Sequence, residues 1–179
     1  NQVDATSSVA DLNPTYNFDA ANTVYPLTDF GEARSKVGVG PMIVDPGNPS
    51  QMIPDPANNG NVGEVFLGNF ATSFAGTIMG GAEGFVNPIP FAPGRTTIRM
   101  RVWTPSAGTT ISLKVEDSVD QNQNAEVILA TSVSGWETLD FDFAVIDQSQ
   151  SFEKLVLIFN PGVARGGETY YWDDVELLP

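Results

Sequence analysis

The sequence predicts an all-β fold, an antiparallel β-sandwich of the jelly-roll type. Nowhere in the 179 residues does an apolar pattern with the helical period persist for ten residues, whereas apolar and polar residues alternate in several short runs. Seventeen glycines and thirteen prolines separate these runs with turns. Because 41% of the residues are hydrophobic, the chain has enough apolar side chains to build one folded core.

The first half of the chain is rich in turns. Residues 1–15 are small and polar, so we expect a linker or a loosely attached N-terminal arm there, followed by a single domain over residues 16–179. Residues 16–95 contain short apolar pieces separated by turn sequences such as Pro46-Gly47-Asn48-Pro49 and Asn59-Gly60. The Asn-Gly pair is a strong signal for a tight hairpin.

Two strands beyond residue 95 have the clearest alternation, one expected at residues 98–103 and the other at residues 111–116. Their inward side chains are expected to be Ile98, Met100, Val102, Ile111, Leu113 and Val115. Their outward side chains would then be Arg99, Arg101, Trp103, Ser112, Lys114 and Glu116. If the two strands pair as a hairpin, these outward side chains share one face of a sheet.

That outward face has two interpretations. Its charges are typical of a solvated surface with cross-strand ion pairs, which are common and weak. Trp103 favours a binding site, because a large aromatic ring among polar side chains offers a flat apolar platform. A sugar ring has a matching apolar face and polar edges. We therefore expect a saccharide to stack on Trp103, with its hydroxyls contacted by Arg99, Arg101, Lys114 and Glu116.

Two further strands are expected before the C-terminal one. In residues 136–143 the inward side chains would be Leu139, Phe141 and Phe143, and we interpret Trp136 at the start of this run as a packing residue. Residues 155–160 are apolar on both faces, which is typical of a central strand. Asn160 at the end of this run either contacts the ligand or begins the following Pro-Gly turn.

The closing strand, Tyr170–Pro179, contains two adjacent carboxylates, Asp173 and Asp174. Aromatic and β-branched residues favour a strand here. With a two-residue period the two carboxylates point to opposite faces, so one of them is expected to turn toward the interior. A buried carboxylate needs a partner, and a hard cation with oxygen ligands would provide one.

The composition excludes several classes of function. A formal net charge of −14 makes nucleic acids and anionic membranes poor partners. The chain has no cysteine for disulfides or thiol catalysis, and no histidine as a general base or zinc ligand. No transmembrane run or signal peptide is visible. Carboxylate-pair chemistry stays open, but the adjacent Glu116 and Asp117 face opposite ways on a strand and cannot act together.

Several short motifs in a fixed order make the chain similar to a known family. Over about residues 16–178 it resembles the β-sandwich carbohydrate-binding modules appended to secreted bacterial polysaccharide-degrading enzymes, notably marine β-1,3-glucanases. The motifs are Asn17-Phe18-Asp19, Thr28-Asp29-Phe30-Gly31, Ala75-Gly76-Thr77, Arg101-Val102-Trp103-Thr104-Pro105, Leu113-Lys114-Val115-Glu116-Asp117-Ser118, residues 136–143 and Tyr170-Tyr171-Trp172-Asp173-Asp174-Val175. One departure is Phe74, where the family pattern has a tryptophan.

This resemblance implies a non-catalytic module that binds a laminarin-like β-glucan and brings an attached glycoside hydrolase of the same parent chain to it. The protein would be secreted or located at a bacterial cell surface. The resemblance also implies a structural calcium held by Asp19 together with Asp174 or Asp173. From the residues alone, Asp19 is equally well explained as a turn residue.

Three alternatives stay open at this stage. The basic side chains of the outward face keep an anionic algal polysaccharide such as alginate possible as the ligand. A catalytic jelly-roll glycosidase or lyase is a second alternative, and a structural adhesion domain is a third. Incubation with polysaccharides separates them, because a binding module retains the glycan, an enzyme releases products and an adhesion domain does neither.

Overall fold

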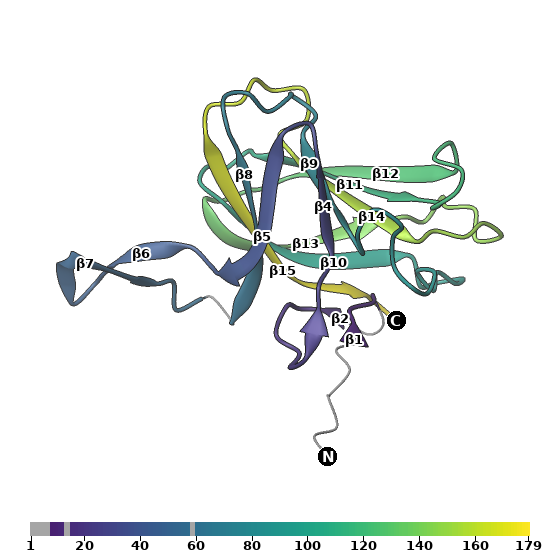
Figure 1. Ribbon diagram of the computed structural model, residues 1–179, viewed down its shortest axis with the longest axis horizontal. Helices are drawn as coiled ribbons and strands as arrows, with labels where there is room; N and C mark the ends of the chain where they lie inside the picture. Colours follow the sequence, from purple (N-terminus) through teal and green to yellow (C-terminus); the bar gives the residue numbers. More distant parts are fainter. Residues whose placement is uncertain (1–7, 13–14, 58–59) are drawn as a thin grey trace, which may run out of the picture.

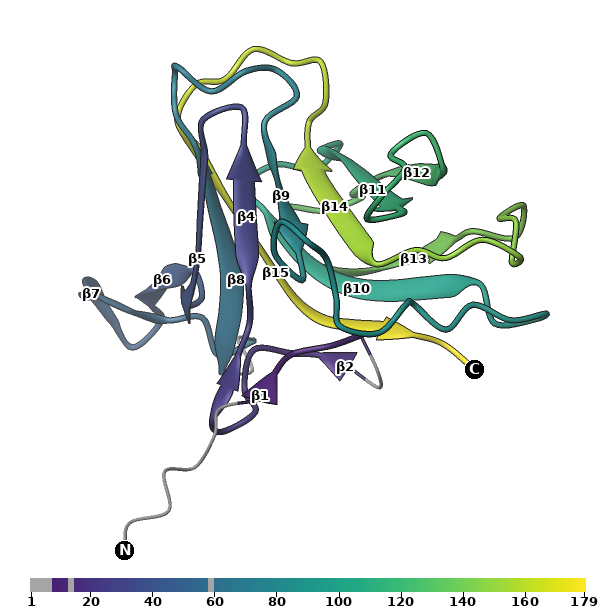
Figure 2. The same cartoon turned by 45° about the vertical axis from the view of Figure 1, so that its right-hand side comes forward.

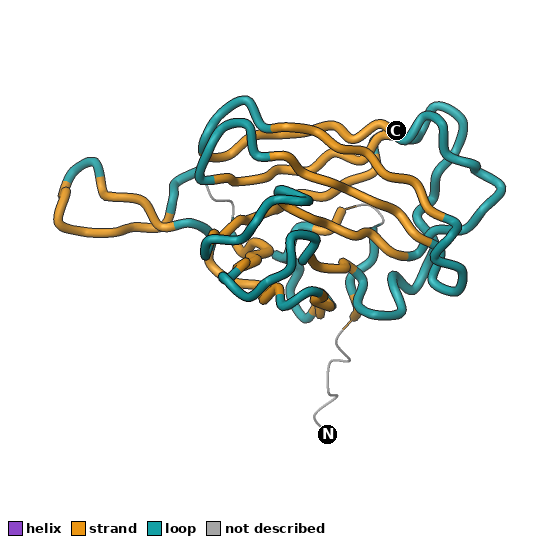
Figure 3. Tube along the Cα trace, turned by 90° about the horizontal axis from the view of Figure 1, so that it is seen from above, coloured by secondary structure: helices purple, strands orange, loops and turns teal. Residues whose placement is uncertain are grey.

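Two antiparallel sheets stacked face to face build the molecule, as Figures 1 and 3 show. The structure, a computed structural model, describes residues 8–12, 15–57 and 60–179. Within these residues the chain forms strands and turns, and no helix is long and apolar enough to cross a membrane. The all-β antiparallel sandwich expected from the sequence is confirmed.

The six-stranded sheet carries the C-terminal strand near its centre. Its order is β13-β10-β15-β8-β5, with the short β2 also paired to β15. The strands are β2 (Thr15–Tyr16), β5 (Ala33–Val39), β8 (Asn61–Leu67), β10 (Thr97–Thr104), β13 (Gly135–Asp142) and β15 (Glu168–Leu177).

The five-stranded sheet has the order β12-β11-β14-β9-β4. Its strands are β4 (Leu27–Phe30), β9 (Gly76–Met79), β11 (Thr110–Glu116), β12 (Asn124–Ala130) and β14 (Lys154–Phe159). β14 is the middle strand of this sheet, in agreement with its continuous apolar sequence.

The core lies between the two sheets and contains the side chains that the alternation placed inward. Ile98, Met100, Val102, Ile111, Leu113 and Val115 are all fully buried. From the C-terminal strand the core receives Trp172, which lies against Gly63 of the neighbouring β8. A methyl group on Gly63 would lie 2.3 Å from the Trp172 ring, so only glycine fits at this position.

The N-terminal residues take part in this packing. Strand β1 (Ser8–Val9) pairs in parallel with β3 (Thr23–Val24), and Ala10 and Leu12 are buried in the core. The core therefore includes residues for which the sequence suggested a linker. Asn59 of the expected Asn-Gly hairpin turn lies outside the described residues.

A two-stranded hairpin projects from the sandwich beside β5, as Figures 1 and 2 show. It consists of β6 (Met42–Asp45) and β7 (Asn48–Pro54), which pair with each other and, among the described residues, with no other strand. At its base the backbone N–H of Asp55 donates to the Pro41 carbonyl at 2.9 Å. This hairpin arm is inserted between β5 and β8, which pair with each other up to its base.

The expected hairpin of the strands at 98–103 and 111–116 is wrong. β10 pairs with β13 and β15, whereas β11 pairs with β12 and β14 in the other sheet. The connection between them crosses the sandwich. Alternation predicts one buried face for each strand, and that face exists equally in a hairpin and in a crossover between two packed sheets. The outward side chains of β10 and β11 therefore lie on opposite surfaces of the molecule.

The expected burial of one carboxylate of the Asp173–Asp174 pair is confirmed, because Asp173 is fully buried, but the expected opposite orientation of the two is wrong. The register between β10 and β15 shifts by one residue between Arg99 and Arg101, which is a β-bulge. Asp174 occupies the left-handed region with φ 48° and provides the extra residue. Because of this bulge both carboxylates lie on the same, outer side of the six-stranded sheet, and both face Arg101.

Candidate functional site

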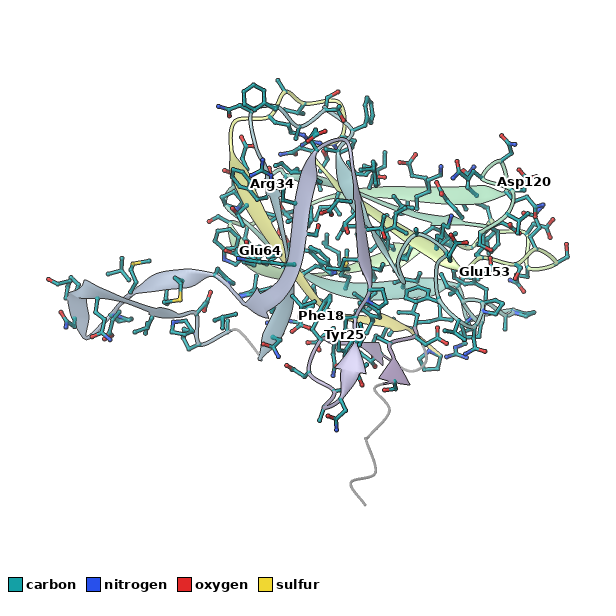
Figure 4. All side chains as sticks on the ribbon, in the orientation of Figure 1. Phe18, Tyr25, Arg34, Glu64, Asp120 and Glu153 are labelled. Atoms are coloured by element: carbon teal, nitrogen blue, oxygen red, sulfur yellow. The ribbon has the colours of Figure 1, made fainter. Side chains whose placement is uncertain are left out.

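A row of side chains crosses the outer face of the six-stranded sheet from one edge strand to the other. Strand register places Trp136 of β13 opposite Trp103 of β10, Trp103 opposite Tyr171 of β15, Tyr171 opposite Glu64 of β8, and Glu64 opposite Lys36 of β5. We call these five residues the cross-strand row. Figure 4 shows Glu64 on its strand at the β5 side of this face.

Aromatic rings form one end of the cross-strand row and charged groups form the other. The Trp103 and Tyr171 rings meet edge to face, with centroids 5.5 Å apart and planes at 79°. Burial raises the pKa of Tyr171, and the charge of Glu64 raises it further. Lys36 Nζ lies 3.1 Å from Glu64 Oε1. This arrangement offers half-buried rings for stacking and a donor–acceptor pair beside them.

Arg101 lies next to the row and connects it to the acidic bulge. Its guanidinium carbon is 4.6 Å from the centroid of the Trp136 ring, a cation–π contact. Its Nη1 lies 3.1 Å from Asp174 Oδ2 and 3.7 Å from Asp173 Oδ2. Its Nη2 donates to the Ala57 carbonyl at 2.5 Å. Arg101 is thus held on three sides by groups of the protein itself.

A polar pocket of about 460 Å³ lies beside the row on the same face. Its lining is rich in hydroxyl, amide and charged groups: Thr15, Asn17, Arg99, Arg101, Thr138, Asp174 and Glu176. Arg99 forms a two-point ion pair with Asp140, at 2.7 and 2.8 Å, which holds the pKa of the Asp140 carboxyl below its usual value. Both arginines of this pocket are therefore paired with carboxylates.

Lys114 and Glu116 lie on the outer face of the five-stranded sheet, away from Trp103. Lys114 Nζ is 2.7 Å from Glu116 Oε1, so the two form an ion pair with each other. A smaller hollow of about 260 Å³ adjoins them, lined by Phe30, Ile78, Glu116, Gln121 and Val156. The single face expected to combine Trp103, Arg99 and Arg101 with Lys114 and Glu116 does not exist, because the strands belong to different sheets.

Asn160 has partners inside the protein. Its Oδ1 accepts a hydrogen bond from the backbone N–H of Thr110 at 3.0 Å, and its Nδ2 donates to the Tyr170 hydroxyl at 3.1 Å. Its φ of 46° is the left-handed conformation that asparagine tolerates in turns. These contacts fit the interpretation of Asn160 as the residue that begins the Pro-Gly turn.

The acidic bulge contains a buried carboxylate, Asp173, and is the place where the sequence predicts a cation. Asp173 is fully buried, and among the described residues neither of its carboxylate oxygens has a hydrogen-bond partner. The pKa of this carboxyl is raised to about 7, mainly by burial and also by the charges of Asp174 and Asp19, while Arg101 acts in the opposite direction. Asp19 accepts a hydrogen bond from the backbone N–H of Asn61 at 2.7 Å. A buried carboxylate with unused oxygens is the donor that calcium prefers.

The carboxylates would not complete such a site alone. Among the described residues no three Asp, Glu, His or Cys side chains are gathered closely enough to hold a metal as they stand. Calcium accepts six to eight oxygen ligands, including backbone carbonyls and water. Asp19, Asp173 and Asp174 would therefore form only the charged part of a calcium site, which backbone carbonyls and water would have to complete.

Sequence reasoning found one member of the cross-strand row and missed the others. Trp103 follows from the alternation of its own strand. Trp136 was placed on the polar side by the same alternation, yet the interpretation as a packing residue hid its place opposite Trp103. Tyr171 was detectable as the outward neighbour of a buried Trp172. Glu64 and Lys36 gave no signal, because only strand register places them in line with the rings.

Comparison with known proteins gives a fold and no family assignment. No family model matches the sequence, and no characterised protein matches it by sequence. A family 11 carbohydrate-binding module from Clostridium thermocellum, solved with a β-1,3-1,4-mixed-linked tetrasaccharide, has a similar structure, with a TM-score of 0.56 and 11% identity over 92% of this chain and 94% of that chain.

Two further solved structures share the architecture. The CBM22-1 xylan-binding domain of Paenibacillus barcinonensis Xyn10C has a TM-score of 0.50 and 12% identity, and the match covers 95% of this chain and 96% of that chain. An exo-β-agarase has a TM-score of 0.60 and 8% identity, and the match covers 93% of this chain but 25% of the agarase. At these identities the likeness establishes the β-sandwich fold.

Proposed function

We propose that this protein is a non-catalytic carbohydrate-binding module and that its ligand, a β-glucan of the laminarin type, lies on the outer face of the six-stranded sheet. The observation that carries the proposal is the alignment of Trp136, Trp103 and Tyr171 on three adjacent strands. Sugar rings stack on aromatic side chains, and the neighbouring polar groups bind their hydroxyls. The shared fold with carbohydrate-binding modules supports the same class of ligand.

A neutral glycan suits this face better than an anionic one. Arg99 is paired with Asp140 and Arg101 with Asp174, so neither guanidinium is available to a ligand carboxylate without losing its present partner. The whole chain carries a formal net charge of −14 and repels polyanions. Alginate is therefore the weaker alternative.

In the parent protein the module would hold an attached catalytic domain near its polysaccharide. A tethered binding site raises the effective concentration of substrate at the enzyme without a new contact at the active site. This role requires a protein that is secreted or displayed at a bacterial cell surface, where such glycans occur. The catalytic alternative is tested in the same incubation, because a glycosidase or lyase releases soluble products.

We also propose that a structural calcium is held at the acidic bulge by Asp173, Asp174 and Asp19. The ion would supply close ligand contacts to the buried oxygens of Asp173, whose ion pair with Arg101 is 3.7 Å long. Calcium that binds only the folded state stabilises it by mass action. In the proposal Arg101 lies at the border between this cation site and the glycan face.

The test compares two single variants for binding to soluble β-glucan by affinity electrophoresis and calorimetry. Trp103→Ala should weaken binding by more than about tenfold, because truncation of a central aromatic anchor costs on the order of 2 kcal/mol. Glu116→Gln, on the opposite sheet, should bind like the wild type. Circular dichroism confirms that both variants are folded.

Each other outcome has a definite meaning. Full binding by folded Trp103→Ala with loss in Glu116→Gln would move the ligand to the hollow on the five-stranded sheet. Release of reducing sugars by the wild type would replace the binding module with an enzyme. Absence of binding to laminarin, mixed-linked glucan, xylan, agarose and alginate alike would overturn the proposed function.

A further inference from the structure

We infer that the cross-strand row binds an extended, internal stretch of a single glycan chain that runs perpendicular to the strands, and that Glu64 and Lys36 form its distal subsite. This inference rests on the proposed function and adds the length and direction of the ligand. Its starting observation is that all five row residues are in direct register on five consecutive strands.

The length of the row sets the length of the ligand. Neighbouring strands lie about 4.8 Å apart, so five strands place the outermost side chains about 19 Å apart. A disaccharide covers only part of this distance. The row also ends on β13 and β5, which are the two edge strands of the sheet. A chain that follows it can continue past both edges, as an internal segment of a polysaccharide does.

The chemistry of the row changes along its length. Three aromatic rings form one end of the row. The Arg101 guanidinium lies over Trp136, so Trp103 and Tyr171 provide the ring surface for stacking, which supplies most of the affinity. Glu64 and Lys36 provide a carboxylate and an ammonium at the other end, where hydroxyls of the chain can accept and donate hydrogen bonds. A short ligand should therefore occupy the aromatic end, and only a longer one should reach the charged pair.

The twist of the sheet favours a single soluble glycan chain over the surface of a crystalline polysaccharide. Adjacent strands are rotated by about 20–25° with respect to each other, so the five side chains follow a curved path across the sheet. A single soluble chain can turn with this path. The flat surface of a crystalline polysaccharide would touch only part of it. The row thus favours soluble glycan over crystalline glycan.

The simpler interpretation of Glu64 and Lys36 is a surface ion pair without a role in binding. Lys36 has 65% of its side chain exposed, which suits that interpretation, whereas only 17% of the Glu64 side chain is exposed. Glu64 also acts on Tyr171, whose pKa its charge raises. Glu64 therefore lies close enough to the aromatic rings to influence them. Measuring affinity as a function of oligosaccharide length separates a surface ion pair from a distal subsite.

The experiment measures the affinity of a β-glucan oligosaccharide series, from disaccharide to hexasaccharide, for the whole chain by calorimetry. Wild-type affinity should rise with length and then level off. Glu64→Gln and Lys36→Ala should bind the disaccharide normally and the hexasaccharide about three- to tenfold more weakly, as expected for one or two lost hydrogen bonds. Arg34→Ala is the matched control, because Arg34 projects from the same strand β5 as Lys36, outside the row, and should bind the whole series normally.

Four results would overturn the inference. Normal binding of every oligosaccharide by Glu64→Gln and Lys36→Ala, with binding still lost in Trp103→Ala, leaves the proposed function intact and shortens the site to the aromatic end. An equal loss for disaccharide and hexasaccharide in the same variants places short ligands at the charged end. Preferential retention on crystalline cellulose contradicts the single soluble chain. Failure of the wild type to bind any member of the series rejects the proposed function itself.

Discussion

Arg101 connects the cross-strand row to the acidic bulge on the outer face. It stacks on Trp136 of the cross-strand row and binds Asp174 of the acidic bulge, and its second nitrogen binds the Ala57 carbonyl. A guanidinium is always charged and offers donors in one plane, which allows it to stack and to bind carboxylates together. The same side chain therefore covers an aromatic ring and partly neutralises a buried carboxylate.

The Asp173 carboxyl makes stability depend on pH in a direction unusual for an aspartate. Its folded pKa of about 7 lies above the ordinary value of 3.8, so the folded state binds the proton more tightly than the unfolded chain. The stabilisation from protonation is complete below about pH 4 and is lost as the pH rises through 7. In calcium-free buffer this group should lower the free energy of unfolding by up to about 4 kcal/mol between those limits.

The check is chemical denaturation of the wild type and Asp173→Asn at several pH values, with a chelator and with excess calcium. The wild type minus the variant isolates Asp173 from carboxyls whose pKa is lowered, namely Asp120, Glu137, Asp140 and Asp147. With chelator the wild type should lose stability relative to the variant as the pH rises. With calcium this loss should shrink and the melting temperature should increase. The calcium proposal would be contradicted if the free energy of unfolding had the same pH dependence in both proteins. It would also be contradicted if the chelator did not change the melting temperature of the wild type.

At the scale of single residues, the sequence predicted which face of a strand a side chain occupies better than it predicted which side chains it contacts. The inward and outward sides of residues 98–103 follow from alternation alone, and they are correct. The burial of one carboxylate of the Asp173–Asp174 pair was predicted, but the common orientation of the two was not, because a one-residue bulge reverses the alternation and leaves no mark in the composition of the strand. The pairing of Arg101 with Asp174 depends on that bulge and was equally hidden.

At the scale of elements, the close packing of β8 on β15 depends on one glycine. A Cβ on Gly63 would meet the Trp172 ring at 2.3 to 2.7 Å, and Trp172 is fully buried, so the ring has little room to move. We expect Gly63→Ala to lower the free energy of unfolding by about 1–3 kcal/mol through overpacking. Urea denaturation measures this loss.

The neighbouring strand offers a matched control. Apart from its own chain neighbours, Gly38 of β5 has no atom of the described residues within 4 Å of the position where a Cβ would be, so Gly38→Ala should leave stability unchanged or raise it slightly. An equal loss of stability in Gly63→Ala and Gly38→Ala would show that the effect comes from the backbone conformation of glycine and not from contact with the Trp172 ring. No loss in either would show that the Trp172 ring can shift at little cost.

The sequence predicted which segments form strands, but it did not predict which strands pair with each other. The strands at 98–103 and 111–116 were both recognised, but short sequence separation suggested a hairpin where the chain crosses between sheets. The cross-strand row depends on pairs such as Tyr171 with Glu64, which are far apart in the sequence. Such pairs are fixed by the packing of the whole sandwich, which a local pattern does not encode.

At the scale of the whole molecule, charge predicts how binding responds to salt. The formal net charge is −14, and Lys36, Arg99, Arg101 and Lys114 are each paired with a carboxylate. Binding of a neutral β-glucan should therefore change less than about twofold between low and high salt, because few long-range charge interactions are gained. Calorimetry at several salt concentrations measures the response.

Alginate should bind poorly at low salt, where repulsion is strongest. Tight alginate binding that weakens as salt is added would contradict this and would restore the anionic polysaccharide as ligand. The comparison needs no variant, since both ligands are tested on the same protein. Loss of neutral glucan binding in high salt would likewise show that ionic contacts dominate the face.

The three tryptophans occupy three different surroundings, and this distribution gives the molecule its own optical reporters. Trp172 is enclosed in the core, Trp103 meets Tyr171 on the open face, and Trp136 lies under the Arg101 guanidinium. Emission from Trp172 should therefore follow unfolding, emission from Trp103 should follow binding of the proposed glycan, and emission from Trp136 should follow movement of the arginine. Variants that keep one tryptophan each would let fluorescence record folding, glycan binding and cation binding as separate signals from an unlabelled protein.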